Sequence, residues 1–243
     1  MLYQLHDGAL LGQAGALAAG LAGLPLLAML AAGLVLWQRR YALPWREALR
    51  PVAGLRGQRR WRNLHRALGF WSLLPLTLAA LTGMTLSFPD TTRALLDPLL
   101  AAPPARWEKA GPLTLDAAVA LAEARLPRHR VAWVDLPMDG GDGVDMALLP
   151  RDGGVAAPAR LHASLRSGLV EYSLAAPVEQ ARAWFMALHN GAALGLGHRL
   201  AISALGLAPG VLLLLGLAMG RRRDAQAAAR QADLPRHSAP AQG

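Results

Sequence analysis

Two histidines stand at matching places before two long apolar stretches of this chain. His6 lies in "LHDGALLGQAG" (5–15), and His189 lies in "LHNGAALGLGH" (188–198). Residues 5–40 align with residues 188–223 at a constant offset of 183, with fifteen identical positions of 36. Apolar composition explains the shared leucines and alanines, but it does not explain the shared histidine, four glycines and two arginines. The two stretches are therefore copies of one unit.

The repeat predicts that the two histidines face one another. Two parallel copies are related by an axis along the membrane normal, which places His6 and His189 at the same depth. Bundles bind cofactors with side chains from facing helices, and a bis-histidine haem needs one imidazole on each side of the porphyrin. The shared glycines leave room for a flat macrocycle. The alternative is that each histidine only caps a helix or forms a hydrogen bond between helices.

Two further histidines are candidate ligands. His65, in "NLHRALGF", stands at the opposite mouth of the second apolar stretch and could face a second haem, although its partner is missing. His198 is either an alternative ligand near His189 or a packed polar residue. The chain has no cysteine, which excludes disulfides, cysteine-ligated iron–sulfur clusters and covalent c-type haem.

Three stretches are apolar enough to cross a membrane, which takes about 20 residues for a core of about 30 Å. We expect transmembrane helices at 14–38 and 67–88, and a third in 188–220 after a short lead-in. Hydrophobic residues make up 53% of the sequence. The first stretch is not a typical signal peptide, because no positive charge precedes it. The fold class predicted is a mainly α-helical membrane protein with one small α+β module.

Arginine clusters predict the orientation of these helices. The loop 39–66 is rich in arginine, and the tail 221–243 begins with three arginines. The positive-inside rule places both in the cytoplasm. The N-terminal segment 1–13 and the region 89–187 then lie in the periplasm. We expect the polar, alanine-rich tail to be disordered. The net charge of +9 does not indicate nucleic acid, because the basic clusters flank apolar helices.

The region 89–187 is long enough for a small domain. "LTLDAAVALAEARL" (113–126) has helical periodicity, with Thr114 or Asp116 as its cap. Residues 130–138 and 143–150 alternate as strands do, and 159–174 predicts two more strands around a turn at Ser167 and Gly168. The module contains no pairing of a nucleophile with a base.

The motifs of this chain resemble the PepSY-associated transmembrane family. The resemblance rests on the L-H-R-x-L-G motif at His65, the L-H-x-G motif at His189 and the module between them. That family includes iron-regulated inner-membrane proteins and ferrisiderophore reductases. The resemblance implies a multi-pass protein of the bacterial inner membrane that carries haem b. It also implies electron transfer to a periplasmic ferric siderophore or redox partner, with His6, His189 and His65 as axial ligands.

The sequence departs from that family in one respect. Members of the reductase type have paired units, whereas this chain opens at an L-H-x-G helix. We therefore expect the first helix and first periplasmic module to be missing, or supplied by a homodimer or a separate N-terminal half. Besides a ferric-siderophore reductase, two alternatives stay open. One is a non-catalytic, membrane-anchored PepSY binding or regulatory module, and the other is a truncated fragment of a larger reductase.

Overall fold

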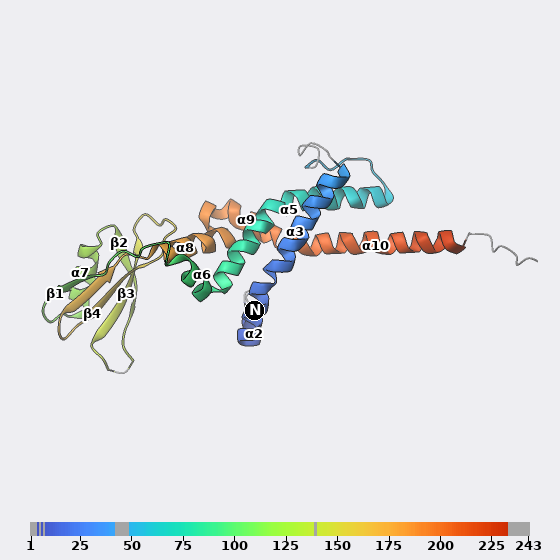
Figure 1. Cartoon of the computed structure of the whole chain (residues 1–243). Coiled ribbons are helices and arrows are strands. Elements are labelled where there is room, and N and C mark those ends of the chain that lie inside the picture. The colour runs from blue at the N-terminus through green and yellow to red at the C-terminus, as the bar shows by residue number, and fades with distance from the viewer. Residues whose placement is uncertain (1–3, 5, 7, 42–48, 139, 233–243) are drawn as a thin grey trace, which may run out of the picture. The chain divides into compact units, whose positions relative to one another are not determined.

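The computed structural model describes residues 4, 6, 8–41, 49–138 and 140–232 (Figure 1). The chain forms two compact units. The first comprises residues 1–23 and 79–199, and the second comprises residues 24–78 and 200–243.

The first unit contains a five-stranded antiparallel sheet in the order β1-β5-β4-β3-β2 (Figure 1). Its strands are β1 (Arg106–Lys109), β2 (His129–Asp135), β3 (Gly143–Pro150), β4 (Ala159–Ser164) and β5 (Leu169–Ser173). Helix α7 (Leu115–Arg125) packs on the sheet, and its cap is Thr114, whose hydroxyl accepts a hydrogen bond from the Ala117 N–H at 3.2 Å. The predicted helix and four strands are therefore confirmed.

The core of this module lies between α7 and one face of the sheet. Ala118 and Ala122 of α7 are fully buried against Leu148 and Leu161 of the sheet. Burial alternates along β4, as expected for a strand with one covered face. Strand β1, with the sequence "RWEK", was not predicted because it has no apolar alternation and is largely exposed.

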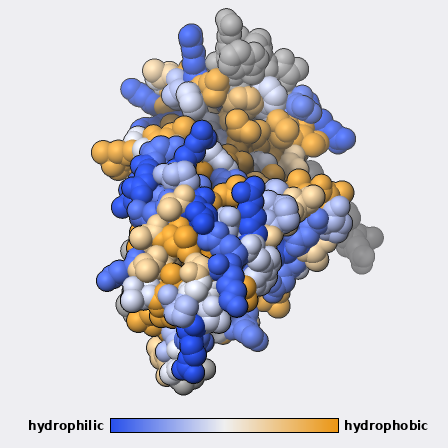
Figure 2. All heavy atoms as spheres, turned by 90° about the vertical axis from the view of Figure 1, so that its left-hand side faces the viewer, coloured by the Kyte–Doolittle hydropathy of each residue, from blue (hydrophilic) through white to orange (hydrophobic). Residues whose placement is uncertain are grey.

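The other face of the sheet is polar and aromatic. His162 on β4 is exposed, and its Nδ1 lies 2.9 Å from Asp145 on β3. Trp107 and Trp133 are also exposed, on the two edge strands. Figure 2, which looks onto the side of the molecule where the sheet lies, shows hydrophilic residues interspersed with hydrophobic ones. His162 is thus an exposed histidine paired with a carboxylate of the neighbouring strand.

Three helical stretches are long and apolar enough to cross a membrane, as predicted: Gly12–Arg39, Gly57–Ser87 and Ala192–Arg221. The first consists of α2 (Gly12–Leu21) and α3 (Gly23–Tyr41), and the second is α5 (Gly57–Ser87). The third contains η2 (Ala192–Leu194), α9 (Gly195–Leu205) and the first part of α10 (Ala208–Ala232).

Two helices extend beyond the segments expected for them. Helix α5 begins at Gly57, ten residues before residue 67, where we expected the transmembrane segment to begin, so part of the arginine-rich loop is helical. Helix α10 continues to Ala232, so the expectation of a disordered tail from residue 221 was wrong for residues 221–232. The reason is local in both cases, because arginine, alanine and glutamine favour helix where no glycine or proline interrupts them. The rest of the tail lies outside the described residues.

In the second unit, α3 and α10 both pack on α5. The rings of Trp37 on α3 and Phe70 on α5 have centroids 5.1 Å apart. The Gln58 side chain donates a hydrogen bond to the carbonyl of Met219 at 3.4 Å, and Gly69 faces the Leu212 side chain. The outward leucines of these helices are largely exposed, as lipid-facing residues must be.

In the first unit, the end of α5 and the following Phe88 pack closely against α2 and the start of α3. A Cβ on Gly20 would lie 2.7 Å from the Phe88 ring, and one on Gly23 would lie 2.6 Å from the Met84 side chain. Small residues allow helices to approach closely in membranes. These contacts hold the segment that follows His6 against the end of α5.

Candidate functional site

The sequence repeat is also a repeat of backbone structure. The 3-10 turns η1 (Ala9–Leu11) and η2 (Ala192–Leu194) are separated by the same offset of 183 residues, and so are the starts of α2 and α9 at Gly12 and Gly195. Gly8 and Gly191 both adopt left-handed conformations, with φ of 74° and 77°. The repeated glycines are therefore required by the same turn in each copy.

These left-handed glycines bring the chain back over the helix that follows. A Cβ on Gly191 would lie 2.6 Å from the Cα of Arg199, and a Cβ on Gly8 would overlap the carbonyl of Gly15. In each copy the histidine stands two residues before this glycine. The turn thus positions His6 and His189 in equivalent ways.

We expect Gly191→Ala to destabilise the protein. A left-handed non-glycine residue costs about 1–2 kcal/mol, and the added methyl group would also displace α9. The prediction is a clear fall in the melting temperature of the detergent-solubilised protein. Gly197→Ala is the matched control, because a Cβ there meets no atom within 4 Å and alanine favours helix. Equal melting temperatures for the two variants would contradict the assigned role of the turn.

The imidazole rings of His6 and His189 point at one another. Their Nε2 atoms are 3.5 Å apart, and their ring centroids are 5.8 Å apart. The centroid distance exceeds the Nε2–Nε2 distance by 2.3 Å. An atom of a five-membered ring lies roughly 1.1–1.2 Å from the ring centre for bonds of this length. The excess therefore equals about two such radii, as expected if both Nε2 atoms lie on the line between the two centroids. The two rings are therefore arranged nearly vertex to vertex, with an interplanar angle of 33°.

This geometry suits a metal held between two imidazoles. Metal–imidazole bonds are about 2.0–2.1 Å long, as for zinc, so a linear nitrogen–metal–nitrogen unit needs the two Nε2 atoms about 4 Å apart. The rings would separate by only about half an ångström to admit it. Within the described parts of the chain, no three His, Asp or Glu side chains converge on a metal position. The pair therefore suits a centre that takes two protein ligands on opposite sides.

His189 is held on two sides by the end of α5. Its Nδ1 lies 3.1 Å from the Thr82 hydroxyl oxygen. A Cβ on Gly83 would lie 3.0 Å from its Cε1 atom. Burial, and to a lesser extent the neighbouring His6, lower the pKa of His189. His189 is therefore neutral at pH 7, the form in which an imidazole binds a metal.

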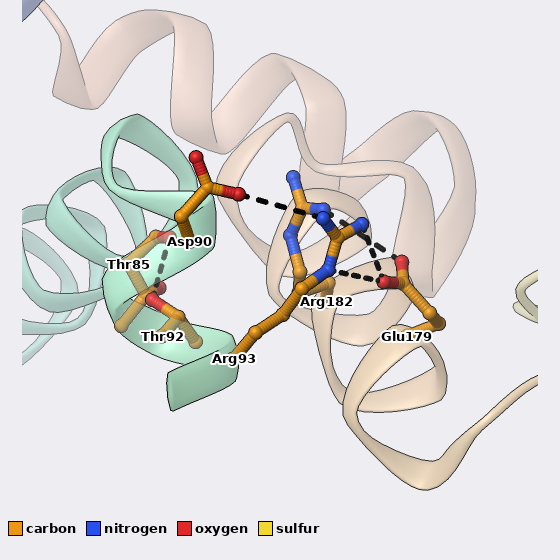
Figure 3. A network of polar contacts seen from close by, with 6 residues as sticks. All are labelled: Thr85, Asp90, Thr92, Arg93, Glu179 and Arg182. Atoms are coloured by element: carbon orange, nitrogen blue, oxygen red, sulfur yellow. Dashed lines mark hydrogen bonds and ion pairs between the residues drawn. The ribbon is translucent and has the colours of Figure 1, made fainter. Parts of the chain in front are cut away.

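The helix that carries His189 is anchored by a polar network (Figure 3). Glu179, near the start of α8 (Pro177–His189), accepts hydrogen bonds from Arg93 of α6 (Pro89–Leu96), with nitrogen–oxygen distances of 2.8 and 2.7 Å. Arg182 lies 3.7 Å from the other Glu179 oxygen. The Thr92 hydroxyl of α6 donates to the carbonyl of Thr85 on α5 at 3.0 Å.

The same helix is also tied to the sheet module. The Gln180 side chain accepts from the Ala157 N–H at 3.1 Å and donates to the Val155 carbonyl at 3.0 Å. Helix α8 thus links the module to the histidine pair. Helices α6 and α8 and this network were not predicted. Their local signals are two i,i+3 pairs, Asp90 with Arg93 and Glu179 with Arg182.

The two histidine rings differ in burial and in the number of neighbouring groups that contact them. His6 is exposed, and its one hydrogen-bond partner in the described parts of the chain is His189. His189 is half-buried and also contacts Thr82 and Gly83. The pair therefore combines one firmly held ring with one loosely held ring.

The other candidate ligands lie apart from this contact. His198 is in α9, and no hydrogen bond or ring contact in the described residues joins it to the pair. Its Nδ1 is buried and has no hydrogen-bond partner there. His65 is in the part of α5 that belongs to the second unit, and its Nδ1 is likewise buried without a described partner.

These features define a class: a membrane protein with three candidate spans, one α+β module and a facing histidine pair. Comparison with protein families then identifies the particular family. The chain belongs to the PepSY-associated TM region family, whose profile matches residues 1–223. No curated protein matches the sequence.

Proposed function

We propose that this protein binds haem b between His6 and His189 and passes electrons to a ferric siderophore as part of bacterial iron acquisition. The observation that carries the proposal is the vertex-to-vertex contact of the two Nε2 atoms at 3.5 Å. A bare metal ion would find only these two ligands among the described residues. A porphyrin supplies four nitrogens itself and needs only two axial ligands.

The chemistry of the proposed group is one-electron transfer, because haem iron alternates between Fe(III) and Fe(II). The protein supplies two imidazoles and close glycine contacts that keep the site compact. Each electron delivered to a siderophore would reduce one ferric ion to Fe(II), which such chelators bind far more weakly. No side chain of the chain needs to act as an acid or base in this step.

The arginine clusters support an orientation for this pathway. With 39–66 and the arginines after residue 220 in the cytoplasm, the histidine pair and the sheet module lie on the periplasmic side of the inner membrane. His65 is then the candidate ligand of a second haem near the cytoplasmic side. Its second ligand would come from another copy of this chain or from a partner chain. His198 is the alternative ligand on the periplasmic side.

The test is a reduced-minus-oxidised absorption spectrum of the detergent-purified protein, with a pyridine haemochrome assay for stoichiometry. We expect a b-type α-band and about one haem per chain, or about two if His65 finds a partner. Absence of haem after expression with ample haem supply would contradict the proposal. That outcome would favour the non-catalytic membrane-anchored binding module, or the fragment of a larger reductase.

A further inference from the structure

We propose that Thr82 is a positioning residue that holds His189 in the tautomer needed for metal binding and so makes His189 the fixed axial ligand. The inference rests on the proposed haem site. It concerns a residue of α5 that lies 107 positions before His189 in the sequence.

The direction of the Thr82 hydrogen bonds decides the tautomer. The Thr82 hydroxyl donates to the carbonyl of Ala79, one turn earlier in α5, at 3.2 Å. Thr77 and Thr85 donate to carbonyls of the same helix in the same manner. With its hydrogen on the Ala79 carbonyl, the Thr82 hydroxyl presents its oxygen to the Nδ1 of His189 at 3.1 Å, and the Ala79 carbonyl is a second acceptor beside the ring. We infer from these two acceptors that Nδ1 carries the proton.

A proton on Nδ1 leaves a lone pair on Nε2. Neutral imidazole carries one N–H and one acceptor nitrogen, and the bond made by one nitrogen determines the state of the other. The Nε2 lone pair of His189 then points toward His6, where the metal would lie. In the haem-free protein, His6 is expected to donate its own Nε2–H to this lone pair.

The surroundings of Thr82 make this arrangement durable. Thr82 is only 3% exposed, so water does not compete for its hydroxyl. Burial and His6 lower the pKa of His189, whereas the Ala79 carbonyl acts in the opposite sense, as an acceptor beside the ring N–H does. Gly83 keeps the ring close to the helix, because a Cβ there would lie 3.0 Å from Cε1.

The first test reads the tautomer directly. Nitrogen-15 spectra of the haem-free, histidine-labelled protein should show His189 protonated at Nδ1, with the signal assigned by its loss in His189→Gln. An Nε2–H signal for His189 would overturn the inference. This reading needs no haem, so it is separable from a failure of the haem proposal itself.

The second test uses three variants of the haem-loaded protein. Thr82→Val removes the hydroxyl but keeps the branched shape, and we expect haem affinity to fall about 10- to 100-fold, as is typical for loss of a partner of a metal-bound histidine. Thr82→Ser should restore affinity to within a few-fold of the wild type. Thr77→Val is the matched control, because the Thr77 hydroxyl bonds the carbonyl of Leu73 in the same helix.

The readouts are the haem dissociation rate and the reduction potential, neither of which a merely structural threonine would change selectively. Unchanged values in Thr82→Val, or an equal loss in Thr77→Val, would overturn the positioning role. If Thr82→Val does not accumulate, Thr82→Ala replaces it under the same criteria. If the wild type itself holds no haem, the haem proposal fails, and the tautomer spectrum still decides the role of Thr82.

Discussion

His189→Ala is expected to abolish haem binding. The substitution removes the imidazole that is held by Thr82 and Gly83, and leaves His6 as the sole ring of the pair. His6 is exposed and has no other hydrogen-bond partner among the described residues, so it cannot by itself hold a macrocycle in one position. The measurement is haem per chain by pyridine haemochrome assay after purification, which should fall to background.

Two control variants make the result specific. His162→Ala changes an exposed histidine on β4 that pairs with Asp145, so its haem content should equal that of the wild type. His198→Ala tests the alternative ligand, which we expect to be dispensable because it makes no contact with the pair in the described structure. Full haem content in His189→Ala would show that the histidine pair is not the cofactor site.

The central feature of the site was predictable because it is symmetric. A constant offset of 183 residues carries the histidine, the left-handed glycine and the helix start together. Residues that share a sequence unit share a backbone conformation, so the two rings arrive at equivalent places. The module was predictable for a different reason. Strand β4 alternates between apolar and polar residues, turn residues separate the predicted strands, and Thr114 is a typical helix cap.

The contacts that surround only one of the two histidines were not predictable. Thr82 contacts His189 across 107 residues of sequence, and no local pattern signals a contact of that range. Helix α8 mixes apolar and charged residues, and its anchor depends on Arg93, which lies 86 residues before Glu179. These contacts exist only once the helices have packed. The sequence therefore predicted which residues pair but not which of the two is better held.

Because Thr82 and Gly83 hold His189 and no such contacts are described for His6, loss of the His6 ring should have a different effect from loss of the His189 ring. We expect His6→Gly to retain haem with reduced affinity, whereas His189→Ala loses it. His189 stays held by Thr82 and Gly83 in this variant, so one axial ligand is preserved. The missing ring leaves a coordination position open on the exposed side of the pair. Added imidazole should fill that position and restore the six-coordinate spectrum, because glycine leaves room for a free ring.

The measurement is an imidazole titration of ferric His6→Gly, with carbon monoxide binding to the ferrous form as a second reading of the open position. Wild type is the control, and it should bind neither ligand readily because both axial positions are occupied. Loss of haem in His6→Gly together with retention in His189→Ala would reverse the assignment and make His6 the fixed ligand. Rescue by imidazole in both variants would show equal support for the two rings, and would contradict the asymmetry that Thr82 and Gly83 create around His189.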